Sequence, residues 1–249
     1  MFPIRDTIPT QRHPFMTRLL IIINILAFLF EVMMPSRQLE QFIYLFGIVP
    51  ARYTNPEWAA WVGFPGGSYA PFLTHMFLHG GWMHIISNMW TLWIFGDNVE
   101  DRMGSFRFLA FYLICGIAAG MTHMVVNPAS TVPSVGASGA IAGVLAAYFL
   151  WFTHSRVLVM IPIIIFPVFA EVPAVLYLGV WFVTQLFSGT ASLVRPNSGA
   201  GIAFWAHIGG FIAGALLCWL FLRPRDKRAP IESEVEDFEP SWQPRWRER

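Results

Sequence analysis

The stretch Val135-Gly136-Ala137-Ser138-Gly139-Ala140 begins an apolar run that extends to Thr153. Its small residues let another backbone come close, and they place a serine hydroxyl at the start of a predicted helix. Far downstream, His207 lies inside a second apolar stretch, from Ala203 to Gly210. A nucleophilic hydroxyl and an imidazole are the minimum for covalent acyl chemistry. The pattern predicts that the rest of the chain brings Ser138 and His207 together.

The composition is typical of a membrane protein. Of 249 residues, 55% are hydrophobic and 12% are charged, whereas soluble domains carry about 25% charged residues. A net charge of +1 gives no indication of nucleic acid as a partner. Cys115 and Cys218 stand alone in apolar runs, so we expect core-filling thiols and neither a disulfide nor a zinc or redox site.

Six apolar stretches predict an all-α polytopic membrane protein, although several are at or below the ~20 residues that cross a bilayer. They are Thr17–Met34, Trp82–Asn98, Ser105–Asn127, Ser138–Thr153, Val172–Gly189 and Ile202–Leu222. The sequence therefore predicts a six-helix membrane domain over residues 17–222, between a cytoplasmic segment at 1–16 and a disordered cytoplasmic tail at 223–249.

The connectors between these spans differ in character. The first loop, Ser36–His79, is too apolar for a solvated linker and too broken for a span, so we expect it to lie embedded in the membrane interface. The run Val157–Phe169 is apolar but contains Pro162 and Pro167, which predicts an interfacial lead-in to the fifth span. Residues 189–201 are predicted to form a loop.

Cationic residues predict the orientation of an integral, multi-pass membrane protein. With a cytoplasmic N-terminus, ten arginines and lysines fall near the inner ends of the spans and three (Arg37, Arg52, Arg195) fall on outer loops. The ten are Arg5, Arg12, Arg18, Arg102, Arg107, Arg156, Arg223, Arg225, Lys227 and Arg228. Both termini are therefore predicted to be cytoplasmic, in the cytoplasmic membrane if the protein is bacterial.

This topology places Ser138, His207, His84 and Asn88 in the outer half of the bilayer. His84 and Asn88 are four residues apart and share one helical face, where both can donate hydrogen bonds to an oxyanion. The backbone N–H of Ser138 is a third possible donor. The fourth and sixth spans contain no Asp or Glu, which favours a Ser–His dyad in which packing orients the histidine.

These motifs resemble the rhomboid family of intramembrane serine proteases. The resemblance covers about Tyr69–Leu217, and its motifs stand in the family's order. They are Gly136-Ala137-Ser138-Gly139 (G-x-S-G), Ala206-His207-Ile208-Gly209-Gly210, His75, His79, His84-Ile-Ile-Ser-Asn88 and Gly96-x3-Glu100-x3-Gly104.

The resemblance implies a role for each matching residue. Ser138 is the expected nucleophile and His207 the expected general base, with Gly136 and Gly139 supporting them. The expected oxyanion hole comprises His84, Asn88 and the backbone of Ser138 and Ala137. Implied partners are transmembrane protein substrates within the lipid bilayer, cut near its outer face, and no cofactor or metal is implied.

One position departs from the family. Rhomboids often carry an aromatic residue four positions after the serine, where it stacks on the catalytic histidine, and this chain has Ala142. Another aromatic side chain, Trp205 or Phe204, is the expected substitute.

Other interpretations of the same residues remain open. A rhomboid-like protein without catalysis, which binds membrane clients, is the main alternative to an enzyme. A histidine-lined transporter is a weaker one, because paired broken half-helices are not evident. The series His75, His79 and His84 has no carboxylate or thiol in register for a metal. The small-x3-small patterns at Gly139 and Gly210 are typical of helix packing.

Overall fold

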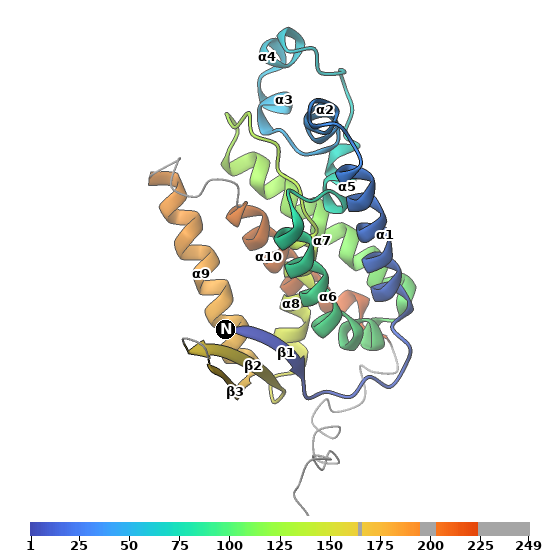
Figure 1. Ribbon diagram of the computed structural model, residues 1–249, viewed down its shortest axis with the longest axis vertical. Coiled ribbons are helices and arrows are strands. Elements are labelled where there is room, and N and C mark those ends of the chain that lie inside the picture. The colour runs from blue at the N-terminus through green and yellow to red at the C-terminus, as the bar shows by residue number, and fades with distance from the viewer. Residues whose placement is uncertain (164–165, 195–202, 224–249) are drawn as a thin grey trace, which may run out of the picture.

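The computed structural model describes residues 1–163, 166–194 and 203–223. Within these ranges six long helices form a bundle, with a sheet at one end and short helices at the other (Figure 1). The long helices are α1 (Phe15–Val32), α6 (Trp82–Met103), α7 (Ser105–Val126), α8 (Ser138–Trp151), α9 (Ala174–Val194) and α10 (Phe204–Phe221). All but one residue of the predicted tail, and residues 195–202 of the predicted loop, lie outside the described ranges.

The six predicted spans each correspond to one long helix, but only some are long and apolar enough to cross a membrane by themselves. Helices α1, α7, α9 and α10 meet that condition. Helix α8 has 14 residues and is apolar but short, about 21 Å at 1.5 Å per residue. Helix α9 continues to Val194, so the prediction of a loop beginning at Gly189 was wrong. An apolar helix continues until a helix-breaking residue ends it, and Gly189 alone does not end α9.

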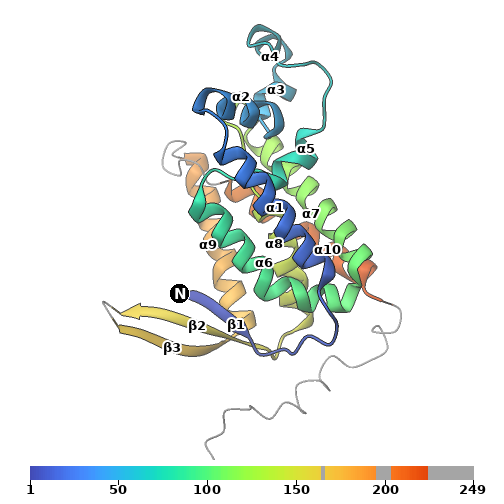
Figure 2. The ribbon, with the colours of Figure 1, turned by 45° about the vertical axis from the view of Figure 1, so that its right-hand side comes forward.

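The predicted helical bundle is confirmed for the long helices, but the chain is not all-α, because the described residues also contain a three-stranded antiparallel sheet. Its strands are β1 (Phe2–Asp6), β2 (Arg156–Ile163) and β3 (Phe166–Pro173), in the order β1-β2-β3. Valine, isoleucine and phenylalanine favour strands, and proline is tolerated on an edge strand such as β3. The prolines that excluded a helix are thus compatible with a hairpin, which lies across the lower end of α9 (Figure 2).

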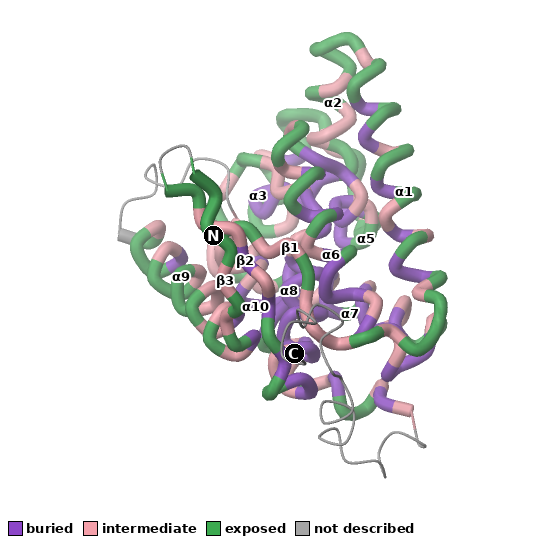
Figure 3. The backbone as a smooth tube through the Cα atoms, turned by 60° about the horizontal axis from the view of Figure 1, so that its bottom comes forward, coloured by how far each residue is buried: buried purple, intermediate pink, exposed green. Residues whose placement is uncertain are grey.

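Helix α8 is the centre of the bundle. Of its 14 residues, 11 are buried, and it contacts α6, α7, α9 and α10. Figure 3 shows the contrast with α1 and α9, which carry much exposed surface at the periphery. Cys115 and Cys218 are free, buried thiols, as the sequence predicted.

Glycines allow the backbones of α8 and α10 to touch. A Cβ added at Gly210 would overlap the carbonyl oxygen of Gly139, and one added at Gly214 would overlap that of Gly143. Because a backbone carbonyl is not a flexible side chain, neither position has room for a larger residue. The interpretation of these small-x3-small patterns as packing grooves is therefore confirmed.

Glu100, near the end of α6, connects that helix to the first turn of α1. Its two carboxylate oxygens accept hydrogen bonds from the backbone N–H groups of Met16 (2.9 Å) and Thr17 (2.7 Å), in the first turn of α1. The Ser105 hydroxyl donates to the same carboxylate. Glu100 is buried, so these bonds satisfy both the carboxylate and two helix-end donors.

The first loop is ordered and tied to the bundle. It contains α2 (Ser36–Phe46), α3 (Pro50–Thr54), α4 (Pro56–Trp61), α5 (Pro71–Thr74) and the 3-10 turn η1 (His75–Phe77). The Arg52 guanidinium donates to the carbonyl oxygens of Leu45 (3.1 Å) and Pro65 (3.2 Å), which closes the loop on itself. Ile48 pairs with Ser134, in the segment that leads into α8. That this loop is embedded in the membrane stays a prediction.

Asp6 joins the sheet to the helices. Its Oδ2 atom accepts hydrogen bonds from the Asn98 amide and the Tyr148 hydroxyl, each at 2.6 Å. Burial, together with the nearby charge of Asp97, raises the pKa of Asp6 from 3.8 to about 7. The docked strand therefore favours a protonated Asp6.

We expect Gly210→Val to destabilise the bundle, because the added side chain meets the Gly139 carbonyl. Overpacking of this kind lowers the midpoint of thermal unfolding by about 5 °C or more. The measurement is thermal unfolding in detergent. Gly66→Val is the control, since a Cβ there meets nothing within 4 Å. Equal midpoints for the two variants would contradict the close backbone contact.

We expect the docking of β1 to weaken as pH rises. The folded-state pKa of Asp6 lies near 7 and its unfolded value near 3.8, so the stabilisation is complete below about pH 4 and lost by about pH 7. The mobility of a nitroxide attached at position 2 (Phe2→Cys, an exposed site) should increase across this range. Asp6→Asn should remove the dependence; an unchanged profile in that variant would assign it to another group.

Candidate active site

The structure brings Ser138 and His207 into contact. Ser138 is the first residue of α8, and His207 lies in the first turn of α10. The Ser138 Oγ atom is 2.8 Å from His207 Nε2, a normal hydrogen-bond length. Both residues are half-buried. The hydroxyl and the imidazole, 69 residues apart in sequence, therefore form a bonded pair.

Gln185 on α9 fixes the tautomer of His207. Its Oε1 atom lies 2.8 Å from His207 Nδ1, while its Nε2 atom lies 3.5 Å from the Trp181 carbonyl oxygen. Because a carbonyl only accepts, the amide nitrogen faces Trp181 and Oε1 faces the histidine. His207 Nδ1 then carries the proton, and Nε2 is free to accept from Ser138. This is the tautomer that a general base requires.

An aromatic ring also packs against His207, but it is not one that we predicted. The Trp181 and His207 ring centroids are 6.0 Å apart with an interplanar angle of 33°. Trp205 instead donates its indole N–H to the Gly189 carbonyl at 3.1 Å. Trp181 and Gln185 are four residues apart on α9 and so share one helical face. The sequence signal for Gln185 was present, since it is the one amide side chain in that apolar helix.

His84 lies beside the glycine that precedes the serine. A Cβ built at Gly136 would be 2.6 Å from His84 Nε2 and 3.6 Å from Ser138 Oγ. Gly136 also has a φ of +129°, which disfavours any other residue. The backbone N–H of Gly80 donates to His84 Nδ1 at 3.3 Å, so Nε2 carries the ring proton. A hydrogen-bond donor therefore faces the space next to Ser138.

Asn88, four residues after His84 on α6, contacts His79. Its amide nitrogen is 3.1 Å from His79 Nε2, and Asn88 is buried. Burial and the neighbouring His84 lower the pKa of His79 to about 3, so its ring is neutral and accepts from the amide. In the described ranges no hydrogen bond links Asn88 to Ser138 or His207. One of the two amide protons remains available to a ligand.

The start of α8 supplies a backbone donor. Ser138 is the first helical residue, and its N–H has no hydrogen-bond partner among the described residues, as expected of a first helical turn. Ala137, immediately before it, is buried. A Cβ at Gly139 would lie 2.5 Å from that of Ala119 and 3.5 Å from the Ala206 carbonyl. This glycine therefore lets α7, α8 and α10 meet at the serine.

The histidine series does not converge on a metal. His75 Nδ1 lies 2.9 Å from the Pro71 carbonyl, whereas His79 and His84 pack against each other with centroids 5.1 Å apart. Among the described residues there is no group of three or more histidine, cysteine, aspartate or glutamate side chains that could hold a metal ion.

The apolar helices and their arrangement define an integral, multi-pass membrane protein. Residues 66–224 match the family model of the Rhomboid domain, more than half of the chain. The chain belongs to the rhomboid family.

Named relatives agree with this assignment. Rhomboid-like protein 11 (chloroplastic) of Arabidopsis thaliana is 32% identical over 155 residues, 60% of this chain and 51% of that protein. Rhomboid protein 1 (mitochondrial) of Saccharomyces cerevisiae is 28% identical over 159 residues, 61% of this chain and 42% of that protein. Rhomboid protease GluP of Bacillus subtilis is 43% identical over 81 residues, 32% of this chain and 15% of that protein. The chain thus matches about half or less of the length of these curated relatives.

We expect Gln185→Ala to slow the reaction of Ser138 with a fluorophosphonate by about tenfold, the equivalent of one lost hydrogen bond of ~1.4 kcal/mol. The loss frees His207 to adopt the tautomer with the proton on Nε2, which cannot accept from serine. Nitrogen chemical shifts of labelled histidine report that tautomer directly. Gln38→Ala, an exposed change on α2, is the control. An unaltered tautomer population would exclude the positioning role of Gln185.

Proposed function

We propose that this chain is an intramembrane serine endopeptidase that cleaves transmembrane or membrane-proximal segments of membrane proteins. The observation that carries the proposal is the 2.8 Å contact between Ser138 Oγ and His207 Nε2, in a tautomer suited to base catalysis. Membership of the rhomboid family supports it, as does the similarity to a relative named as a protease.

In the proposed acylation step, Ser138 Oγ attacks the scissile carbonyl carbon while its proton passes to His207 Nε2. The carbonyl oxygen becomes an oxyanion. His84 Nε2, the free amide proton of Asn88, and the backbone N–H groups of Ser138 and Ala137 would donate to it. As the tetrahedral intermediate collapses, His207 returns the proton to the leaving amine and the C–N bond breaks.

In deacylation, water attacks the acyl-enzyme and its proton passes to His207, which then protonates Ser138 Oγ as the acid product leaves. The dyad works without a carboxylate, so the imidazolium needs other support. Gln185 Oε1, 2.8 Å from Nδ1, accepts the hydrogen bond that the Nδ1–H of the imidazolium donates. The face of Trp181, with its centroid 6.0 Å away, adds a cation–π contribution.

The proposed substrates are transmembrane helices with small, helix-breaking residues near the outer membrane face. We further propose that both termini lie in the cytoplasm, which places the sheet on the inner side and the serine in the outer half of the bilayer. The half-buried state of Ser138 and His207 supports access of the water that hydrolysis requires.

The proposal predicts that a fluorophosphonate probe labels the detergent-solubilised protein at Ser138. Ser138→Ala should lose all labelling, whereas Ser36→Ala, at the exposed start of α2, should label like the wild type. A rhomboid-like protein that only binds membrane clients would not label at all. The readout is fluorescence of the labelled band after electrophoresis.

Variants of the other proposed site residues can be followed by cleavage of a transmembrane substrate. His207→Ala should abolish cleavage because the general base is removed. Asn88→Ala should only weaken it, since one oxyanion donor among several is typically worth ~100–1000-fold in rate. Near-wild-type turnover in both variants would refute the assignment of these residues.

A further inference from the structure

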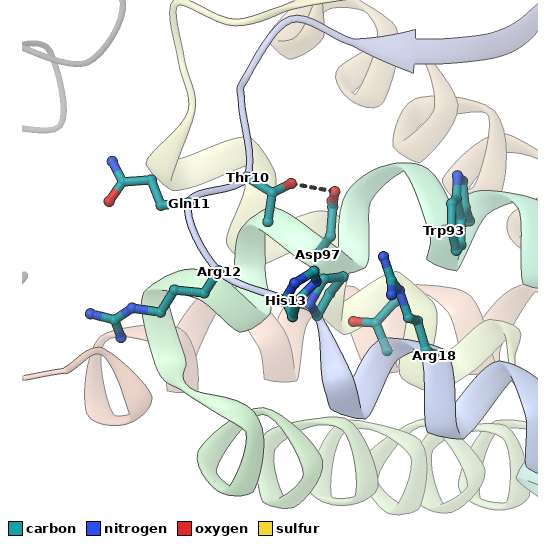
Figure 4. A pocket seen from close by; sticks show the side chains of 9 residues that line it. Thr10, Gln11, Arg12, His13, Arg18, Trp93 and Asp97 are labelled. Atoms are coloured by element: carbon teal, nitrogen blue, oxygen red, sulfur yellow. Dashed lines mark hydrogen bonds between the residues drawn. The ribbon is translucent and has the colours of Figure 1, made fainter.

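A polar pocket lies at the sheet end of the bundle, away from Ser138. It encloses about 320 Å³ where the N-terminal segment crosses α6 at the start of α1 (Figure 4). Arg12, His13, Arg18, Trp93, Thr10 and Asp97 line it. We call it the basic pocket, because it contains two guanidinium groups and an imidazole against one carboxylate.

The single carboxylate that lines the basic pocket is already engaged. Asp97 Oδ2 accepts from the Thr10 hydroxyl at 2.6 Å, and Oδ1 accepts from the backbone N–H of Asn98 at 2.8 Å. The charge of Arg18 is not paired with it. Within the described ranges, the Arg18 guanidinium makes no side-chain hydrogen bond or ion pair and lies over the Trp93 ring, 5.9 Å from its centroid. Its donors are therefore available to an anion.

Arg12 lies at the rim and is only loosely held. Its Nε atom is 4.0 Å from Asp101 Oδ1, and its side chain is 48% exposed. In Figure 4, Arg12 and Gln11 extend away from the group formed by His13, Arg18 and Asp97. A flexible cation beside a fixed one is suited to an anionic group that enters from the surface.

An apolar groove continues from the basic pocket along α1. This second cavity encloses about 220 Å³, and His13 and Arg18 line both cavities. Its other lining residues are Phe15, Leu19 and Ile22, which share one face of the helix. Phe15 and Ile22 are 62% and 53% exposed, on a helix apolar enough to span a membrane. With α1 spanning a membrane, this groove would face the hydrocarbon region.

We propose that the two cavities together form a binding site for an anionic phospholipid. The phosphate contacts Arg18, His13 and Arg12, and one acyl chain lies along Phe15, Leu19 and Ile22. Basic pockets beside transmembrane helices at the inner surface are known to suit acidic headgroups. A free phosphate would use the first cavity alone, so the apolar groove favours a lipid.

The N-terminus of α1 does not provide this site. The first free N–H groups of α1 are those of Met16 and Thr17, and Glu100 already accepts from both. Binding would therefore depend on the side chains of the basic pocket and groove. It would occupy the end of α1 that Glu100 fixes to α6, and it is independent of the proposed proteolysis.

The test is native mass spectrometry of the full chain in detergent, titrated with phosphatidylglycerol, phosphatidylcholine or glycerol 3-phosphate. We expect phosphatidylglycerol to bind more tightly than phosphatidylcholine. Each cation near an acidic surface is worth about fivefold in affinity. Arg18→Gln should thus weaken phosphatidylglycerol binding about fivefold and Arg12→Gln/Arg18→Gln about 25-fold. Arg5→Gln, an exposed arginine on β1 outside the pocket, should leave it unchanged.

A second pair of variants tests the groove without removing charge. Ile22→Trp fills it and should weaken the lipid but not glycerol 3-phosphate, whereas Ile25→Trp, exposed on α1 outside the groove, should change neither. If Arg5→Gln and Arg18→Gln lowered the affinity for phosphatidylglycerol equally, the proposal would be overturned. So would an Ile22→Trp variant that binds phosphatidylglycerol normally, because a site for free phosphate alone would then explain the pocket.

Discussion

The close contact between the backbones of α8 and α10 is the constraint on which this structure depends. Glycines at 210 and 214 leave no side chain between α10 and the carbonyl oxygens of Gly139 and Gly143. Since Ser138 precedes the first contact and His207 lies three residues before Gly210, the same contact fixes the distance between hydroxyl and imidazole. The geometry of the site is therefore a consequence of helix packing.

The sequence was sufficient to predict the pair and the helices that carry it, and insufficient for what surrounds them. Ser138 and His207 are conspicuous because polar groups in apolar spans are rare. Gln185 was missed because a single amide in a span gives no indication of its partner. The contact between Gln185 and His207 Nδ1 depends on the rotation of α9 about its axis. The apolar pattern of that helix does not define this rotation.

The sheet was missed for a different reason. The run from Arg156 to Pro173 is apolar with prolines, and such a composition excludes a helix without specifying a partner strand. One partner of β2 is β1, which is more than 140 residues away in sequence and partly polar. Strand pairing at this separation depends on tertiary contacts, such as the bond from Tyr148 to Asp6. The local pattern of apolar and polar residues contains no information about the pairing of β1 with β2.

The brevity of α8 has a consequence for where this chain can accept an added residue. Its 14 residues run from Ser138 to a buried Trp151 at the sheet end. One inserted residue would turn the serine by about 100° and displace it by about 1.5 Å along the axis. The glycine positions that face α10 would rotate away with it. An insertion between Ser138 and the Gly143 contact would therefore disrupt the site, whereas the segment around Gly66, where an added Cβ meets nothing within 4 Å, has room for extra residues.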